Sequence, residues 1–462
     1  MAAVRARRSG RVLATNRMEN TSHQLKSKTR LSVNIRLSVD CNVNDLQMNM
    51  VLSGGVGILS TPYALASGGW LSLLLLFLIA AATFYSGLLI KRCMDLDSNI
   101  KSYPDIGDRA FGRNGRIIVS IFMNIELYLV ATGFLILEGD NLENLFPNFA
   151  IEVGGLTIGG KQSFVVIIAL IILPTVWLDN LSLLSYVSAS GVLASIITLG
   201  SIFSTGAFDG VGFHRKGTLV NWKGIPTSIS LYAFCYCAHP VFPTLYTSMK
   251  KKHQFSHVLL VCFFLCTFIY ASMAVFGYLM FGSEVQSQIT LNLPTTKLSS
   301  RVAIYTTMVN PIAKYALMVT PVVNTIKMRF STQYSKRPYS LLISTGFVIS
   351  TVIVALVVPF FGYLMALVGA FLSMTASVIL PCLCYLKISG AYRRHGCEMM
   401  AILGIVSLAV LIAVVGPLQL YRRYGCEMMA ILGIVSLAVL IAVVGVYQIL
   451  ETLNLHMKLT NE

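Results

Sequence analysis

Long runs of apolar residues follow one another along most of the chain, and short polar stretches separate them. Residues 71–90, 163–178, 258–281 and 341–358 each approach the ~20 residues that an α-helix needs to cross a bilayer. Inside lipid the backbone must satisfy its own polar groups, so such runs predict membrane-spanning helices. We expect helices at 46–66, 69–90, 116–137, 163–179, 183–206, 225–248, 257–282, 301–326, 339–358, 363–386, 397–416 and 426–449.

The same pattern divides the chain into four parts. Residues 1–40 are rich in Lys and Arg and lack apolar periodicity, which predicts a disordered basic cytosolic tail, with an organellar transit peptide as the alternative. Residues 41–390 form a transmembrane core of ten helices. Residues 391–450 hold a final helix and its tandem copy, and residues 451–462 form a short C-terminal tail.

The tandem copy makes the number of helices ambiguous. The segment from Tyr392 to Gly416 recurs from Tyr421 to Gly445, and the one change is His395 to Tyr424. A single near-identical copy indicates a recent duplication, or an error in the predicted coding sequence, and not a solenoid repeat. The chain therefore has eleven or twelve membrane helices, depending on whether the copy spans.

Composition supports the membrane interpretation. Hydrophobic residues make up 55% of the chain and charged residues 12%, and the mean hydropathy is +0.73. A soluble domain carries about a quarter charged residues, so most of this surface must face lipid. The ten cysteines form no C-x-x-C pair and most lie in apolar segments, which indicates neither a zinc site nor a disulfide framework.

The net charge of +16 does not indicate nucleic acid, because of where the charges lie. Lys and Arg concentrate in alternate short loops, for example at 250–252 and 393–394. This asymmetry follows the positive-inside rule and predicts a cytosolic N-terminus. In the second copy, Arg422 and Arg423 would lie on the opposite side, against that rule.

Two of the expected helices are interrupted. The first contains a glycine-rich break at 53–57, and the sixth contains a break at 237–240 followed by Pro243. Breaks at membrane depth are tolerated where the freed backbone faces protein or water. Two of them, five helices apart, indicate an inverted-repeat transporter whose site suits an amino acid zwitterion. The alternative is that the glycines only allow close helix packing.

Ionisable side chains inside the expected helices are candidates for chemistry. Glu126 and Lys314 fall near the middle of the third and eighth helices, where charge is costly and usually functional. They are candidates for proton coupling, with a structural salt bridge as the alternative. His239 lies in the second break, where it would act either as a proton relay or as a neutral donor that fills the gap left by Pro240.

Several short motifs carry a resemblance to a known family. They are GGVGILSTPY at 54–63, GGW at 68–70, SYPDIG at 102–107, LEGDN at 137–141, FCYCAHP at 234–240, TSMK at 247–250 and VNPIAKYA at 309–316. Together they resemble the amino acid/auxin permeases, and specifically the vacuolar amino acid transporters of plants and fungi. The resemblance covers roughly residues 50–400.

The resemblance implies an all-α polytopic membrane protein with a LeuT-like fold. This fold has five plus five inverted helices, with the first and sixth broken, and one further helix. The implied function is proton-coupled, secondary active transport of neutral amino acids, most often at the vacuolar membrane and otherwise at the plasma membrane. The implied partners are the amino acid, a proton gradient and the bilayer, without nucleic acid, cofactor or metal.

The resemblance also assigns a site. Position by position, the substrate would contact these residues: Gly54, Gly55, Val56, Gly57 and Thr61 at the first break, and Phe234, Tyr236 and His239 on the opposite wall. The chain departs from the family in a more polar segment at 42–47, an altered loop at 327–338 and the duplicated end.

Three other functions remain as alternatives. The protein could bind an amino acid as a sensor without moving it, or carry an indole acid such as auxin. An enzyme is disfavoured, because the helices show neither a metal-ligand cluster nor a nucleophile with its base.

Overall fold

The computed structural model describes residues 57–153, 156–177, 181–249, 251–329, 337–358, 360–390 and 396–418, all within one unit, Gln47–Glu462. The predicted basic tail, the first break with Gly54, Gly55 and Val56, the second copy of the C-terminal segment and the C-terminal tail lie outside these residues.

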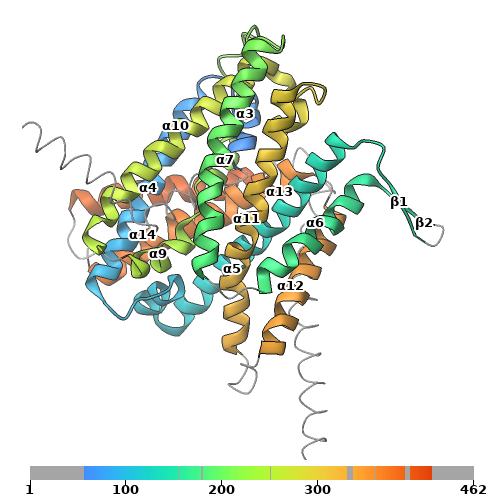
Figure 1. Cartoon of the computed structure of the whole chain (residues 1–462). Helices are drawn as coiled ribbons and strands as arrows, with labels where there is room; N and C mark the ends of the chain where they lie inside the picture. Colours follow the sequence, from blue (N-terminus) through green and yellow to red (C-terminus); the bar gives the residue numbers. More distant parts are fainter. Residues whose placement is uncertain are drawn as a thin grey trace, which may run out of the picture. The chain divides into compact units, whose positions relative to one another are not determined.

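Helices account for nearly all of the described structure (Figure 1). In chain order they are α3 (Gly57–Gly68), α4 (Ser72–Leu96), α5 (Tyr103–Leu145), α6 (Gly160–Trp177), α7 (Leu181–Phe208), α8 (Ile225–Cys235), α9 (Phe242–Ser248), α10 (Phe255–Phe281), α11 (Leu298–Arg329), α12 (Arg337–Val357), α13 (Phe361–Leu367) and α14 (Leu380–Ser389). A last helix, Cys397–Leu418, follows. Short 3₁₀ turns lie at His239–Val241, Lys252–Gln254, Gly282–Glu284 and Ile289–Asn292.

Eight helical segments among the described residues are long and apolar enough to cross a membrane: Ser72–Leu96, Tyr103–Leu145, Gly160–Trp177, Lys252–Glu284, Leu298–Ile326, Ser340–Val357, Phe361–Ser389 and Cys397–Leu418. Leu74, Leu78, Phe264 and Phe268 are each more than half exposed, as lipid-facing side chains of a membrane helix are. The predicted polytopic helical class is confirmed. The total of eleven or twelve helices stays a prediction.

One connection holds a feature that the hydropathy pattern did not predict. Between α5 and α6 the chain forms a two-stranded antiparallel hairpin of β1 (Ile151–Val153) and β2 (Leu156–Ile158), with Glu152 opposite Thr157. Each strand has three residues, too few for an alternating pattern to stand out in the sequence. The hairpin leaves the helical fold class unchanged.

The third predicted helix is longer than expected and bent. α5 runs from Tyr103 to Leu145 and turns sharply at Gly112, where φ is 65° and ψ is −158°. Only glycine adopts this backbone region readily. The Ser102 side chain and the Asp105 carboxylate form a capping box that starts the helix. The SYPDIG motif at 102–107 therefore lies at the start of the first arm of α5.

The predicted interruption of the sixth helix is present. α8 ends at Cys235, residues 236–238 are not helical, and a 3₁₀ turn at His239–Val241 leads into α9. Pro240 and Pro243 lack the N–H group that a continuous helix would need at these positions. Farther along, the segment between α13 and α14 winds as a π-helix at Val368–Ser373 and Thr375–Ile379. Such wide turns often mark functional sites.

Candidate functional site around the break after α8

Glycines allow two elements to approach the break closely. A Cβ atom on Gly57 of α3 would lie 2.8 Å from Cys235 Sγ and 3.0 Å from Cys235 Cα. A Cβ atom on Gly369 of the π-helical segment would lie 1.9 Å from the Ser230 carbonyl oxygen and 2.9 Å from Phe234 Cβ. Because no larger side chain fits these gaps, α8 is held directly between α3 and the π-helical segment.

The three predicted wall residues of the break point toward three different elements. Phe234 packs against Gly369. Tyr236 faces α10, where its hydroxyl lies 2.9 Å from Thr267 Oγ1 and its ring stacks on Phe263 with centroids 5.7 Å apart. His239 faces α4. All three predicted residues are buried, and each anchors the break to a neighbouring element.

His239 ties the break to α4 and to the π-helical segment. Its Nε2 atom lies 2.9 Å from the Thr83 carbonyl oxygen and 2.9 Å from Ser86 Oγ. Ser86 Oγ donates to the Ser377 carbonyl oxygen at 2.5 Å, so its proton is already committed. Both neighbours of Nε2 therefore accept, which assigns the ring proton to Nε2. Nδ1 has no hydrogen-bond partner in the described structure. These contacts favour the neutral-donor interpretation of His239.

Thr61 and Gly57 lie in the first turns of α3. The Thr61 hydroxyl donates to the Ile58 carbonyl oxygen at 2.9 Å, and the neighbouring Ser60 hydroxyl donates to Gly57 at 3.0 Å. Both hydroxyls are fully buried. The side chain of Thr61 is thus engaged within its own helix, while the N-terminal end of α3 lies beside the break.

Glu126 and Lys314 are both buried, at 0% and 1% exposure. None of the ion pairs among the described residues joins them, and neither carboxylate oxygen of Glu126 has a hydrogen-bond partner. Both side chains nevertheless interact electrostatically with the thiol of Cys237, which lies inside the break. The structure therefore places both predicted charges within electrostatic range of the break, and no ion pair joins them to each other.

Sequence reasoning missed several polar residues of this region. Ser373 interacts with both Glu126 and Cys237, and its hydroxyl makes no hydrogen bond of normal geometry. Ser86 contacts His239 and donates to the Ser377 carbonyl oxygen, so it links His239 to the π-helical segment. A serine within an apolar run does not by itself indicate a functional site. The small residues at 369–370 and 376–377 were the available hint, since they allow close packing.

Comparison with known proteins decides the family. The profile described as "Transmembrane amino acid transporter protein" matches residues 50–422, which contain every element described above. The chain belongs to this transporter family.

Several named relatives of the family are similar to this chain over most of its length. Amino acid transporter AVT1I of Arabidopsis thaliana is 66% identical over 363 residues, which cover 78% of this chain and 90% of that protein. Amino acid transporter AVT1J of the same plant is 65% identical over 367 residues, 79% and 87% of the two chains. Amino acid transporter AVT1B is 48% identical over 335 residues, 72% and 62%. The predicted amino acid/auxin permease resemblance is confirmed, and the family and these relatives are transporters and not enzymes.

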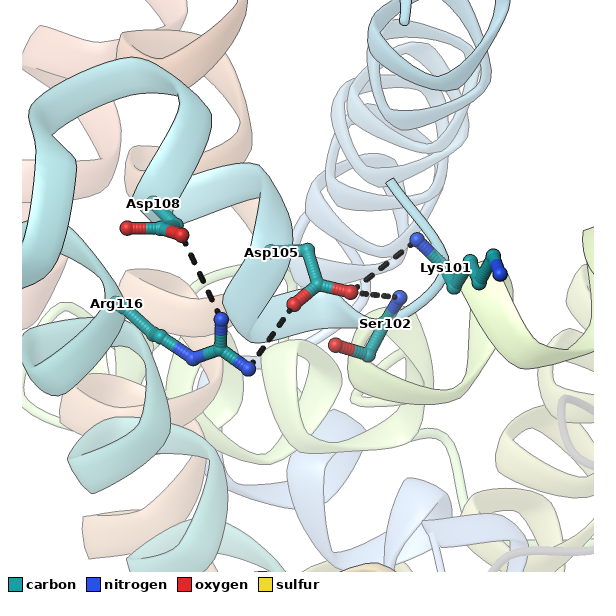
Figure 2. A network of polar contacts seen from close by, with 5 residues as sticks. All are labelled: Lys101, Ser102, Asp105, Asp108 and Arg116. Atoms are coloured by element: carbon teal, nitrogen blue, oxygen red, sulfur yellow. Dashed lines mark hydrogen bonds and ion pairs between the residues drawn. The ribbon is translucent and has the colours of Figure 1, made fainter. Parts of the chain in front are cut away.

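In this family member, charged side chains gather at the start of α5 (Figure 2). Arg116 lies 3.3 Å from Asp105 and 3.5 Å from Asp108, and the backbone N–H groups of Lys101 and Ser102 donate to Asp105. Arg116 follows the bend at Gly112, and the two aspartates precede it. The network therefore fastens the two arms of α5 to each other.

Further polar contacts join the C-terminal part of α4 to α9 and to the last helix, and the last helix to α14. Arg92 forms an ion pair with Glu398 at 2.6 Å, and the Tyr385 hydroxyl donates to the same carboxylate at 3.2 Å. The Tyr246 hydroxyl of α9 donates to Asp95 at 2.5 Å. α9 follows the break directly, so these contacts connect the break to the polar end of α4.

Among the described residues, no group of three or more His, Cys, Asp and Glu side chains is placed to hold a metal ion. The chemistry that these residues offer is therefore hydrogen bonding and charge around a broken helix.

Proposed function

We propose that this membrane protein is a secondary active transporter that moves neutral amino acids across the vacuolar membrane and couples this movement to protons. The observation that carries the proposal is the broken helix α8–α9 with Glu126 and Lys314, both buried, within electrostatic range of Cys237 in the break. The family match and the relatives named amino acid transporters support the substrate class.

The substrate carboxylate would sit at the N-terminal end of α3, with Gly54, Gly55 and Val56 next to Gly57. The first N–H groups of a helix have no partner within the helix and carry the positive end of its dipole. An apolar substrate side chain would suit the aromatic and small residues that surround the break, such as Phe234 and Gly369. Phe234 and Gly369 offer no charge or hydrogen-bonding side chain, so a charged substrate side chain placed against them would be buried without a partner.

Coupling to protons would use the two buried charges. Glu126 can take up and release a proton, and the ammonium of Lys314 can take the place of a bound cation. We place the N-terminus and the charged network of Figure 2 in the cytosol, because Lys and Arg concentrate on that side. The resemblance of the motifs to vacuolar amino acid transporters favours the vacuolar membrane, and the plasma membrane is the second candidate.

Uptake into proteoliposomes with an imposed pH gradient tests the proposal. We expect saturable uptake of several neutral amino acids that collapses when an uncoupler is added. If uptake is undiminished in the presence of the uncoupler, the proposed coupling to protons is refuted. Amino acid binding without flux would support a sensor instead, and uptake restricted to indole-3-acetic acid would support an auxin carrier.

A further inference from the structure

We infer that Glu126, with the hydroxyl of Ser373 beside it, binds the α-ammonium group of the substrate and thereby selects amino acids against acids that lack an amine. The inference rests on the proposed function and names the group of this chain that recognises one end of the substrate. The residues that carry it are Glu126 on α5, Ser373 on the π-helical segment and Cys237 in the break.

The first observation is a carboxylate with no partner. Glu126 is fully buried, and both of its oxygens lack a hydrogen-bond partner. An isolated carboxylate in an apolar interior is strongly unfavourable, and structures normally compensate it with a cation or with donors. The Glu126 carboxylate lacks both in the described structure.

The second observation is that another unpartnered polar group accompanies it. Ser373 is buried at 1% exposure and its hydroxyl has no partner of normal geometry, although the side chain interacts with Glu126 and with Cys237. Ser373 closes the first π-helical turn, Val368–Ser373. Two polar side chains from different elements thus face the break with hydrogen-bonding capacity unused.

The third observation is the partial exposure of Cys237. Cys237 is half-buried, whereas the other residues from 230 to 243 are buried. Cys237 is therefore the most accessible residue of this stretch, and it lies within electrostatic range of Glu126.

The chemistry of these groups fits an ammonium. Such a group has three N–H donors and no acceptor. The two oxygens of Glu126 and the Ser373 hydroxyl oxygen supply three acceptors, and hydrogen bonds between charged groups are about twice as strong as neutral ones. In the inferred pose the substrate has its carboxylate at α3 and its ammonium at Glu126.

The same geometry explains how other acids would be rejected. An α-hydroxy acid or an indole acid has a carboxylate for α3 but no cation for Glu126. Its binding would leave the buried carboxylate without compensation, and sites that hold polar groups in this way reject such analogues strongly.

Binding of a labelled neutral amino acid to the purified protein tests the inference, with its α-hydroxy acid and indole-3-acetic acid as competitors. We expect the amino acid to bind at least roughly 100-fold more tightly than the hydroxy acid. Glu126→Gln should weaken amino acid binding by roughly 100-fold and Ser373→Ala by roughly 10-fold, in line with the charged and neutral hydrogen bonds removed. In Glu126→Gln the preference over the hydroxy acid should largely disappear.

Matched variants control for folding. Glu152 is an exposed carboxylate in β1, and Ser407 is an exposed serine in the last helix, so Glu152→Gln and Ser407→Ala should bind as the unchanged protein does. Size-exclusion profiles and thermal unfolding should show Glu126→Gln to be folded. If Glu126→Gln is unstable, Glu126→Asp and Ser373→Ala carry the test, and both should lower the preference for the amino acid.

The inference and the proposed function can fail separately. If Glu126→Gln keeps the affinity and the preference for the amino acid, the ammonium assignment is overturned even if proton-driven uptake is altered. If the unchanged protein binds amino acids with the predicted preference but does not move them, transport fails while the assignment stands. If it binds amino acids and hydroxy acids equally, the assignment is overturned as well.

Discussion

At the scale of single residues, His239 shows how much one side chain can hold together. It is the first residue of the 3₁₀ turn after the break, and its Nε2–H is shared between Thr83 and Ser86 of α4. Ser86 extends the chain of hydrogen bonds to Ser377. Both contacts of Ser86 are buried. Ser86 therefore links α4, the 3₁₀ turn at His239–Val241 and the π-helical turn at Thr375–Ile379.

Replacing Ser86 by Ala should therefore destabilise the protein and slow transport. The substitution leaves the Ser377 carbonyl oxygen and part of the His239 N–H unsatisfied, which costs about 1–3 kcal/mol for each buried polar group. Thermal unfolding in detergent, together with the uptake assay, measures both effects. Ser407→Ala removes a hydroxyl from an exposed site of the last helix and should leave both unchanged. Equal unfolding temperatures for the two variants would refute this role of Ser86.

The residues of the site differ in how far the sequence could predict them. The buried charges Glu126 and Lys314 stood out because charge is rare in apolar runs, and the structure places both near Cys237. That Glu126 and Lys314 are not joined to each other was not predictable, since it depends on how α5 and α11 are turned about their axes. For the same reason the sequence could not say that Phe234, Tyr236 and His239 face different neighbours.

At the scale of elements, two prolines allowed the break in the sixth helix to be predicted. The interruption at 236–238 follows from Pro240 and Pro243, which cannot donate in a helix. The π-helical turns between α13 and α14 left no such signal, because their residues are as apolar as those of an ordinary helix. The short β1–β2 hairpin and the bend at Gly112 also escaped the pattern of apolar runs, which reports burial but not backbone path.

Gly369 provides a test of the packing between the π-helical segment and α8. A Cβ atom there would overlap the Ser230 carbonyl oxygen, so Gly369→Ala must push the two segments apart, and we expect a loss of about 1–3 kcal/mol in stability. Gly404 of the last helix has nothing within 4 Å of a Cβ atom, so Gly404→Ala should be neutral or slightly stabilising. The unfolding temperatures of both variants measure this difference. If Gly369→Ala is as stable as the unchanged protein, the contact between Gly369 and Ser230 can relax and the prediction is wrong.

At the scale of the whole molecule, the last described helix is attached by groups that the chain carries twice. Glu398 binds Arg92 and Tyr385, and Gly416 packs against Ala370 and Ser230. The sequence from Tyr421 to Gly445 repeats both residue types at the same spacing, as Glu427 and Gly445. The duplication therefore supplies a second set of the same contacting residues.

Deleting residues 392–420 should consequently leave a functional protein. Ala391 would then precede Tyr421, and Glu427 and Gly445 would take the positions of Glu398 and Gly416. We expect uptake within about twofold of the full chain, because the ion pair is exposed and such pairs contribute about 0–1 kcal/mol. A deletion of residues 421–449 should behave in the same way. Loss of uptake in one deletion but not in the other would show that the two copies are not equivalent.

The Arg92–Glu398 ion pair also has a consequence for which natural sequence changes this protein tolerates. The second copy contains an equivalent glutamate, Glu427, so selection against a mutation of Glu398 should be weak. Selection against a mutation of Glu427 should also be weak as long as Glu398 is present. Natural variants of this gene should accordingly tolerate changes in either copy far better than changes at Arg92, which has no duplicate.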